Sequence, residues 1–387
     1  MAIPIAYNLR NLVVRRTTSI MTAIGIASSV AILVASLALV QGLGTVFANT
    51  AHPLQMLVLH QGVTAEIGSR VSTEAFSIVS AYPGIAADRR GRALASQELV
   101  NVANLPSTSN PRGMNVTVRG LGSTGIEMRR VRLVQGRWFQ PGHREVVVGA
   151  SVTTRYPSAR IGQRIRFGKG DWEVVGVMDG GESVVNSEIW ADIRQIAGDY
   201  NRFDNSSSVL IRAADAHALE ALAHAIEDDR RLNATAVTER TYYESQTASG
   251  APLEMLGILV AIIMAIGSAF ATANTMYAAV ASRAREIGTL RTLGFSPGHI
   301  LVSFLAESVL LSAAAGLLGC VVALPLNWVT TGVGSFASFS EITFRFHVGT
   351  TALFSGLAFA MVLGTLGGLV PARAAAKKDI LAALRET

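Results

Sequence analysis

Residues 283–294 read Arg283-Ala284-Arg285-Glu286-Ile287-Gly288-Thr289-Leu290-Arg291-Thr292-Leu293-Gly294 and form a charged island in the most apolar part of the chain. The flanking segments Met255–Ser282 and Ser308–Ser340 contain no Asp, Glu, Lys or Arg. Apolar runs of about 20 residues are long enough to cross a membrane as helices. The island is therefore predicted to be a short polar connection between two membrane spans, placed where a protein in the cytosol can contact it.

The composition is typical of an integral membrane protein. Half of the 387 residues are hydrophobic, 16% are charged, and the mean hydropathy is +0.39. The net charge of +6 does not indicate nucleic-acid binding, because residues 43–253 carry 22 basic and 21 acidic side chains and the remaining excess lies mainly beside the apolar segments. The single cysteine, Cys320, excludes an intramolecular disulfide.

The N-terminal part is predicted to contain two helical segments. Residues 1–19 form an amphipathic cytosolic or interfacial helix, with arginines that no acidic residue balances. Residues 20–42 form the first transmembrane helix. A cleaved signal peptide is the alternative, but the apolar core is longer than the roughly 7–15 residues of such peptides, which favours a retained anchor.

Residues 43–252 are predicted to form one water-soluble α+β domain of about two subdomains. The segment Asn101–Arg112, rich in Asn, Pro and Ser, is a candidate subdomain boundary. Apolar alternation and turn residues predict strands at Gln55–Leu59 and Glu145–Val148, a hairpin at Ile161–Val177 turning at residues 168–171, and helices at Thr73–Ala81 and Asp215–Arg231.

Three further transmembrane helices are predicted at residues 253–281, 300–328 and 348–371. They are separated by a coupling segment (282–299) and a short outer loop (329–347), and a tail (372–387) follows. The coupling segment and the tail carry a basic excess, whereas the outer loop balances Arg345 against Glu341. The positive-inside bias then places both chain ends and the island in the cytosol, and the α+β domain outside. The predicted fold is a four-helix membrane protein with a large α+β domain between helices 1 and 2.

The island is the first candidate site. On a helical wheel Ile287, Leu290 and Leu293 share one face with Arg283 and Glu286. A face that mixes apolar and charged residues suits docking into a groove that offers both kinds of contact. The alternative is a tight connector whose arginines only fix the topology. The candidate coupling residues are Arg283, Arg285, Glu286, Ile287, Gly288, Leu290, Arg291, Leu293 and Gly294.

The ends of the island helix are also predicted. Gly294 can end it, and Ser296-Pro297 suit the N-cap and first position of the next helix. No G-x-x-x-x-G-K-[ST] loop occurs, since Lys169 in Gly168-Lys169-Gly170 lacks that spacing, and the histidines form no H-x-x-x-H pair. We therefore expect no catalytic residue, bound cofactor or metal in this chain.

Polar and small residues inside the spans give two further candidates. Glu307 lies about two turns into the third span, and a carboxylate there is a functional candidate by default. A structural pairing with Asn274 or with an arginine at the cytosolic edge is favoured over a proton relay. Small residues at four-residue spacing predict close helix packing at Gly364, Gly368, Ser312 and Gly316.

The island resembles the R-E-I-G-x-L-R-x-L-G signature of FtsX-like permeases, which belong to the MacB and lipoprotein-releasing group of ABC transporters. Similarity to this family continues over nearly the whole chain. It includes Asn8-Leu9-Arg10 before the first span, Gln135-Gly136-Arg137-Trp138-Phe139 in the outer domain, Phe304 and Glu307, Pro371-Ala372-Arg373, and Ala383-Leu384-Arg385. Ile380 departs from the Pro that often stands in the family tail.

The resemblance implies a function. MacB carries a fused ATPase ahead of its first span and this chain has none, so a separate cytosolic ABC ATPase would bind ATP and Mg and dock on the island. A second permease, identical or related, would complete a dimer in the bacterial inner membrane. ATP hydrolysis would move the periplasmic domain without a substrate channel through the spans, a mechanism called mechanotransmission.

The cargo stays open at this point. Export of a small amphiphile, peptide or lipid-linked cargo through a periplasmic adaptor of the membrane-fusion type is favoured. Lipoprotein extraction, or control of a cell-wall hydrolase, is the alternative within the family. A membrane-anchored sensor or scaffold without an ATPase is the alternative from another class. Membrane lipids are expected partners, and nucleic acid is not.

Overall fold

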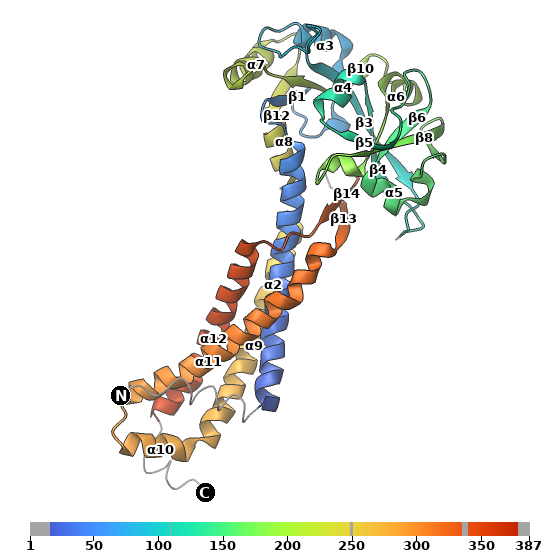
Figure 1. Cartoon of the computed structure of the whole chain (residues 1–387). Helices are drawn as coiled ribbons and strands as arrows, with labels where there is room; N and C mark the ends of the chain where they lie inside the picture. The colour runs from blue at the N-terminus through green and yellow to red at the C-terminus, as the bar shows by residue number, and fades with distance from the viewer. Residues whose placement is uncertain (1–15, 109, 248–250, 335–339, 378–387) are drawn as a thin grey trace. The chain divides into compact units, whose positions relative to one another are not determined.

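The computed structural model describes residues 16–108, 110–247, 251–334 and 340–377 (Figure 1). Residues 1–15 of the predicted N-terminal amphipathic segment and residues 378–387 of the predicted tail lie outside these residues, and residues 16–19 belong to the first membrane helix. The chain forms two compact units. The helical unit comprises Met1–Gln41, Pro252–Val329 and Phe346–Thr387, and the α/β unit comprises Gly42–Ala251 and Thr330–Arg345.

Within the described residues, four helices are long and apolar enough to cross a membrane, with mean hydropathies between 2.0 and 2.4. They are α2 (Arg16–Thr50), α9 (Ala251–Ser282), α11 (Pro297–Ala323, continued by the 3-10 turn η5, Leu324–Trp328) and α12 (Thr350–Lys377). The short helix α10 (Ala284–Thr292) connects α9 to α11. The predicted fold class is confirmed: four apolar helices accompany a large mixed α/β domain that is inserted between the first and the second.

Helix α2 continues beyond residue 42, where the sequence predicts the end of the first span. Its last turns belong to the α/β unit, where Leu43, Val46 and Phe47 are buried. The Phe47 ring stacks on Tyr243 of α8 with centroids 5.9 Å apart. Burial of these apolar side chains explains why the helix does not stop at the end of the apolar run.

Apolar side chains and short polar bridges hold the helical unit together. One core joins α2, α11 and α12 around Ile26, Val30 and Ala360. A second core joins α9, α10, α11 and α12 around Met276 and Phe304. Hydroxyl pairs connect α2 to α9, at 2.6 Å between the Oγ1 atoms of Thr22 and Thr275 and at 2.7 Å between the Oγ atoms of Ser29 and Ser268. Such interhelical bonds satisfy polar groups that lipid cannot.

The α/β unit is built on a mixed ten-stranded sheet in the order β12-β1-β11-β3-β4-β9-β6-β8-β5, with β7 paired to β8. Two further two-stranded sheets are formed by β2 with β10 and by β13 with β14. The strands of the α/β unit are β1 Gln55–His60, β2 Val71–Ser72, β3 Ala95–Leu105, β4 Met114–Leu121, β5 Arg132–Gly136, β6 Glu145–Gly149, β7 Arg164–Phe167, β8 Gly170–Asp179, β9 Glu188–Asp192, β10 Asn205–Ser206, β11 Ser208–Arg212, β12 Ala234–Thr238, β13 Thr330–Gly334 and β14 Glu341–Arg345. Its helices are α3 Thr73–Ser80, α4 Ser123–Met128, α5 Ala150–Arg155, α6 Ile193–Tyr200, α7 Ala216–Asp228 and α8 Glu239–Thr247, with 3-10 turns η1 Glu66–Gly68, η2 Pro157–Ala159 and η3 Val184–Ser187.

Buried clusters on two groups of strands define two lobes (Figure 1), and the second lobe carries a further cluster around Val147 and Trp190. Lobe 1 consists of β1, β11 and β12 with α3 and α7, around buried Val58, Val209 and Leu222. Lobe 2 consists of β4 to β9 with α5 and α6, around buried Val118 and Trp172. Strand β3 pairs with β11 on one side and with β4 on the other, so it joins the lobes.

Both membrane helices that flank the inserted domain lead into lobe 1. Helix α2 ends at Thr50 and β1 follows at Gln55, while β12 ends at Thr238 and α8 begins at the next residue. Strands β1 and β12 are antiparallel neighbours, with Met56 opposite Thr238. The chain therefore leaves the first span and returns toward the second at adjacent strands.

The strands β1 and β6, the β7–β8 hairpin and the helices α3 and α7 confirm the local predictions within one to three residues at most ends. Two other segments differ from the expectations. The proposed boundary Asn101–Arg112 is wrong in its first part, because β3 runs through Leu105 and its Leu99 and Ala103 are core residues. The outer loop 329–347 contains the strands β13 and β14, which pair with Val333 opposite Ile342.

Candidate functional site

The island folds as helix α10 with the predicted ends. Gly294 adopts φ +94°, a left-handed conformation that glycine tolerates, and the N–H of Phe295 donates to the carbonyl of Leu290 at 3.1 Å. Ser296 is the N-cap of α11, and Pro297 occupies its first turn. These local signals fix the length of α10 independently of any partner.

One side of α10 is anchored in the helical unit and the other is exposed. Ala284, Ile287 and Gly288 are buried, and Ile287 joins the core formed with α9, α11 and α12. Arg285, Glu286, Thr289 and Leu293 are exposed, and Leu293 is 72% exposed. The nine predicted coupling residues are therefore divided between buried, half-buried and exposed positions. Ile287 and Gly288 position the helix, and Leu290 and Arg291 are half-buried at its edge.

The predicted single face thus differs from the observed one. Ile287 and Leu293 lie six residues apart, which is about 120° around a helix. The neighbouring helices cover only one edge of that arc, so Ile287 is 2% exposed while Leu293 remains accessible. The exposed patch of α10 is narrower than the wheel predicts, and it consists of Arg285, Glu286, Thr289 and Leu293.

Two arginines tie α10 to the helices around it. Arg283, the residue before α10, donates from Nη1 and Nη2 to the Glu307 carboxylate of α11 at 2.8 and 3.2 Å. Its guanidinium also lies 5.7 Å from the centre of the Phe304 ring. Arg291, in the last turn of α10, donates to the carbonyl of Ala376 in α12 at 3.3 Å. Both ends of α10 are thereby fixed to the bundle.

The structure brings Glu307 to an arginine and places Asn274 elsewhere. Asn274 is exposed on α9, whereas Glu307 is 4% exposed and faces Arg283. The structure thus pairs Glu307 with an arginine by two hydrogen bonds, which is one of the two structural pairings that the sequence predicts.

The four predicted packing residues meet in one place, the contact between α11 and α12. A Cβ on Gly316 would lie 2.5 Å from Cβ of Ala360, and a Cβ on Gly368 would lie 2.5 Å from Cβ of Ser308. A Cβ on Gly364 would overlap Ser312. The small residues let the two helices approach closely within this chain.

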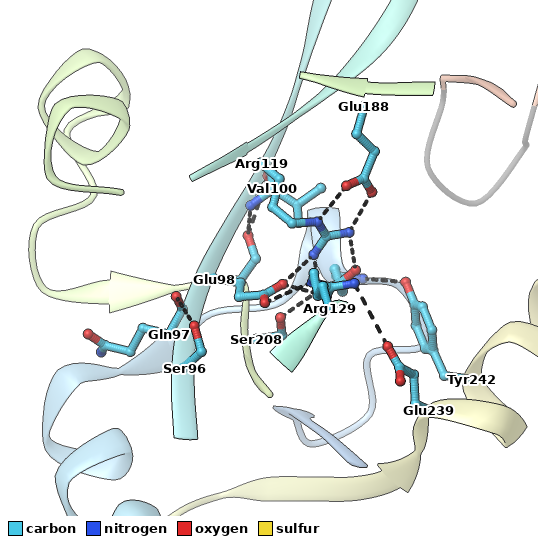
Figure 2. A network of polar contacts seen from close by, with 12 residues as sticks. Ser96, Gln97, Glu98, Val100, Arg119, Arg129, Glu188, Ser208, Glu239 and Tyr242 are labelled. Carbon is cyan, nitrogen blue, oxygen red and sulfur yellow. Dashed lines mark hydrogen bonds and ion pairs between the residues drawn. The ribbon is translucent and has the colours of Figure 1, made fainter. Parts of the chain in front are cut away.

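The α/β unit contains a second cluster of charges, at the junction of the lobes (Figure 2). Arg119 of β4 uses all five of its N–H groups on three carboxylates. Glu66 and Glu188 each receive two of these bonds, and Glu98 of β3 receives one at 2.7 Å. All four side chains are at most 5% exposed. Carboxylates from three separate segments are thus held on one guanidinium.

A second guanidinium extends this cluster toward the chain exits. Arg129 donates to both oxygens of Glu98, at 3.0 and 2.6 Å, and its Nη1 lies 3.8 Å from Oε1 of Glu239 (Figure 2). Glu239, the first residue of α8, accepts from the N–H of His52, just beyond α2, at 2.9 Å. The cluster therefore also connects the two ends through which the inserted domain is attached.

Burial and the neighbouring charges act differently on these carboxyls. Burial raises the pKa of Glu66 and of Glu188, but the Arg119 guanidinium outweighs it, so both end lower than usual. Burial raises the pKa of Glu239 to about 7, since Arg129 opposes it only at a longer distance and Glu98 and Glu66 repel a further charge. Four carboxyls face two guanidiniums, and Glu239 can take up a proton near neutral pH.

Sequence reasoning did not find this cluster. The available signal is a charged residue inside an apolar strand, as in Val116-Thr117-Val118-Arg119. Its partners lie 21, 53 and 69 positions from Arg119, and no local spacing connects them.

Comparison with known families matches two models to the chain. Residues 19–229 match the MacB-like periplasmic core domain, and residues 258–380 match the FtsX-like permease C-terminal model. The first match alone covers more than half of the chain.

Several curated proteins are similar over most of this chain. The macrolide export ATP-binding/permease protein MacB of Shewanella oneidensis is 25% identical over 86% of this chain and 56% of its own length. The pyoverdine export ATP-binding/permease protein PvdT of Pseudomonas savastanoi pv. phaseolicola is 38% identical over 34% of this chain and 18% of its own length. The chain spans about half the length of the MacB relatives it matches.

Solved structures give weaker matches. The periplasmic region of MacB from Actinobacillus actinomycetemcomitans aligns with a TM-score of 0.39 at 12% identity, over 51% of this chain and 94% of that one. The extracellular domain of the ABC-type transporter YknZ from Gram-positive bacteria aligns with a TM-score of 0.36 at 13% identity, over 47% of this chain and 98% of that one.

Proposed function

This chain belongs to the FtsX-like permeases that carry a MacB-like periplasmic core domain, and we propose that it couples ATP hydrolysis by a separate cytosolic ATPase to movement of its α/β unit. It is an ABC transporter permease and a multi-pass membrane protein. In this proposal the ATPase binds ATP and Mg; the 387 residues themselves contain no loop of the G-x-x-x-x-G-K-[ST] type. Mechanotransmission then delivers work outside the membrane.

The observation that carries this proposal is the division of α10 into an anchored and an exposed side. The exposed patch combines a basic, an acidic and an apolar side chain in Arg285, Glu286 and Leu293. Arg283 and Arg291 connect the anchored side to α11 and α12. A force applied to the patch is therefore transmitted to two membrane helices, through a buried ion pair to α11 and a part-buried hydrogen bond to α12.

The orientation and partners are part of the same proposal. The basic excess of the coupling segment and the tail supports a cytosolic position for α10 and for both chain ends, in a bacterial inner membrane. The relatives that export macrolides and pyoverdine support an export cargo for this chain, either a small amphiphile, a peptide or a lipid-linked molecule. We further propose a second permease copy or relative, and a periplasmic adaptor of the membrane-fusion type.

The experiment is affinity purification of the tagged full chain from native membranes, with assay of the ATPase that comes with it. We expect Arg285→Glu/Leu293→Asp to reduce the bound ATPase at least tenfold. Docking contacts of this kind contribute about 1–3 kcal/mol, and 1.4 kcal/mol is a factor of ten.

The matched control is Arg373→Glu, which makes the same Arg-to-Glu change at an exposed residue of α12 and removes one basic residue from the positive-inside balance, as the double variant does. It should bind the ATPase within twofold of the unchanged chain. Normal ATPase recovery with the α10 double variant would contradict the coupling role.

A further inference from the structure

The segment that connects α11 to α12 packs into the α/β unit, and the proposed coupling mechanism gives this contact no role. Strands β13 and β14 pair as an antiparallel hairpin (Figure 1). Glu341, Ile342, Thr343 and Phe344 of β14 are all buried. The hairpin docks on lobe 2 at three elements: the end of α5, the 3-10 turn η3 and strand β4. A loop that only joined two spans would not need this burial.

Glu341 is the centre of the contact. Its carboxylate, 3% exposed, forms an ion pair with Arg155 at the end of α5 and accepts a hydrogen bond from Oη of Tyr156 at 2.8 Å. Burial and the nearby carboxylate raise the pKa of Tyr156, so its hydroxyl remains a donor. A Cβ on Gly332, in the facing strand, would overlap the Glu341 carboxylate. Glycine at this position leaves the space that the carboxylate occupies.

Two further bonds flank Glu341. The Oγ atoms of Ser340 and Thr117 of β4 are 2.6 Å apart, and the N–H of Thr343 donates to Oγ of Ser187 in η3 at 2.8 Å. Ser340, Thr343 and their two partners are each at most 8% exposed. Polar contacts that are buried together hold a defined geometry, since losing one leaves its partner unsatisfied.

The hairpin also reaches the lobe junction. A cavity of about 40 Å³ is lined by Glu341 and Ile342 on the hairpin and by Glu66, Arg119 and Glu188 of the charge cluster. Helix α2 touches lobe 2 as well, since Thr50 Oγ1 accepts from the N–H of Val184 at 2.9 Å. That contact of α2 is a single hydrogen bond. The hairpin, in contrast, is attached to lobe 2 by an ion pair and three hydrogen bonds.

We propose that Glu341 is a positioning residue that clamps the α11–α12 connection to lobe 2, so that movement of α11 and α12 turns lobe 2 against lobe 1. Lobe 1 receives the movement of α2 and α9 through the adjacent strands β1 and β12. In this proposal α2 and α9 move lobe 1, and α11 and α12 move lobe 2. The Arg119 cluster between the two lobes is the pivot. This inference rests on the proposed ATP-driven movement and adds where it is delivered.

The test measures the distance between the lobes in the full chain, purified with its ATPase and placed in lipid nanodiscs. Nitroxides are attached through p-acetylphenylalanine at Glu74 of α3 in lobe 1 and at Gln163 before β7 in lobe 2, both exposed. Cys320 is replaced by alanine, and labelled chain is diluted with unlabelled chain. The probe is ATP with vanadate. We expect a change in the distance distribution in the unmodified hairpin, and loss of at least half of that change in Glu341→Gln.

Covalent rescue separates a clamp from a merely stabilising contact. Thr117→Cys/Ser340→Cys places two thiols where the hydroxyl oxygens are 2.6 Å apart, close to the 2.0 Å of a disulfide. Oxidation should restore the ATP-dependent change in the Glu341→Gln background, and reduction should abolish it again. If Glu341→Gln folds poorly, Arg155→Gln/Glu341→Gln removes both charges and is rescued in the same way.

The controls and outcomes are distinct. Glu173→Gln, at an exposed carboxylate of lobe 2, should leave the distance change unaltered. A full distance change in Glu341→Gln, or no rescue on oxidation, would overturn the clamp alone. No nucleotide-dependent change in the unmodified chain would overturn the proposed function and the clamp with it.

Discussion

Arg283, the residue before α10, and Glu307, in the third turn of α11, form a two-point ion pair, with Nη1–Oε2 at 2.8 Å and Nη2–Oε1 at 3.2 Å. The side chains are 8% and 5% exposed. The pair fixes the first turn of α10 to α11, so the exposed patch of α10 has a defined orientation. An isolated buried charge is costly, which means that neither partner can be lost alone without a large effect.

We therefore predict that Glu307→Leu destabilises the chain by about 3–5 kcal/mol, because it leaves the Arg283 guanidinium buried without its carboxylate. Arg283→Met/Glu307→Leu removes both charges and should recover most of the lost stability, while recovery of bound ATPase stays low. Thermal unfolding of the full chain in detergent measures the first effect and the purification assay the second. A double variant no more stable than Glu307→Leu would contradict the pairing.

The contact between α11 and α12 gives a second prediction. Gly316→Leu should lower the stability by about 1–3 kcal/mol, since the site has no room beside Ala360. The matched control is Gly267→Leu in α9, where a Cβ meets nothing within 4 Å. Unfolding midpoints of the two variants, compared in the same detergent, check this. Equal midpoints would show that the glycine is not needed for packing.

Features with local signals could be predicted from the sequence. The ends of α10 follow from Gly294 and Ser296-Pro297, each acting on its own backbone. The four membrane helices follow from apolar runs whose length is set by the bilayer. The partner of Glu307 could be narrowed to an arginine or Asn274, because few polar groups occur nearby in the chain.

Features that depend on partners distant in the sequence could not be predicted. Glu341 and Arg345 read as a balanced pair in an outer loop, yet Glu341 pairs with Arg155, 186 positions away. The sequence predicts too wide an exposed face on α10, because a helical wheel gives the direction of each side chain but not which side chains the neighbouring helices bury. Phe47 and Tyr243, which extend α2 into the α/β unit, are likewise joined only by the fold.

A third prediction concerns Arg119. Its five bonds to three carboxylates need a guanidinium, so Arg119→Lys, with three donors, should destabilise the chain by several kcal/mol, and Arg119→Met more. The control is Arg92→Lys at an exposed pair with Asp88, which should leave the unfolding midpoint unchanged. Chymotrypsin sensitivity of the α/β unit in the full chain is an independent readout, because an opened cluster exposes Tyr242 and Tyr243. Protection equal to that of the unchanged chain would contradict the prediction.

Glu239 gives a prediction of pH dependence. Its pKa in the folded chain is about 7, above the ordinary 4.5, so the folded chain binds more protons than the unfolded chain between pH 4.5 and 7. Stability from this group is therefore present at low pH and is lost as the pH rises through this window, by up to about 3 kcal/mol. Burial and Arg130 lower the pKa of the adjacent His52, which acts in the opposite direction below its usual pKa.

The variant Glu239→Gln isolates the carboxyl, because glutamine resembles its protonated form and His52 is present in both chains. We expect nearly equal unfolding midpoints near pH 4 and a higher midpoint for Glu239→Gln at pH 8. Glu244→Gln, five residues later on the exposed side of α8, should keep the decline of the unchanged chain. Parallel pH profiles for the unchanged chain and Glu239→Gln would mean that the carboxyl is ionised throughout. Arg129 would then hold it charged, and the cluster would contain no group that titrates near neutral pH.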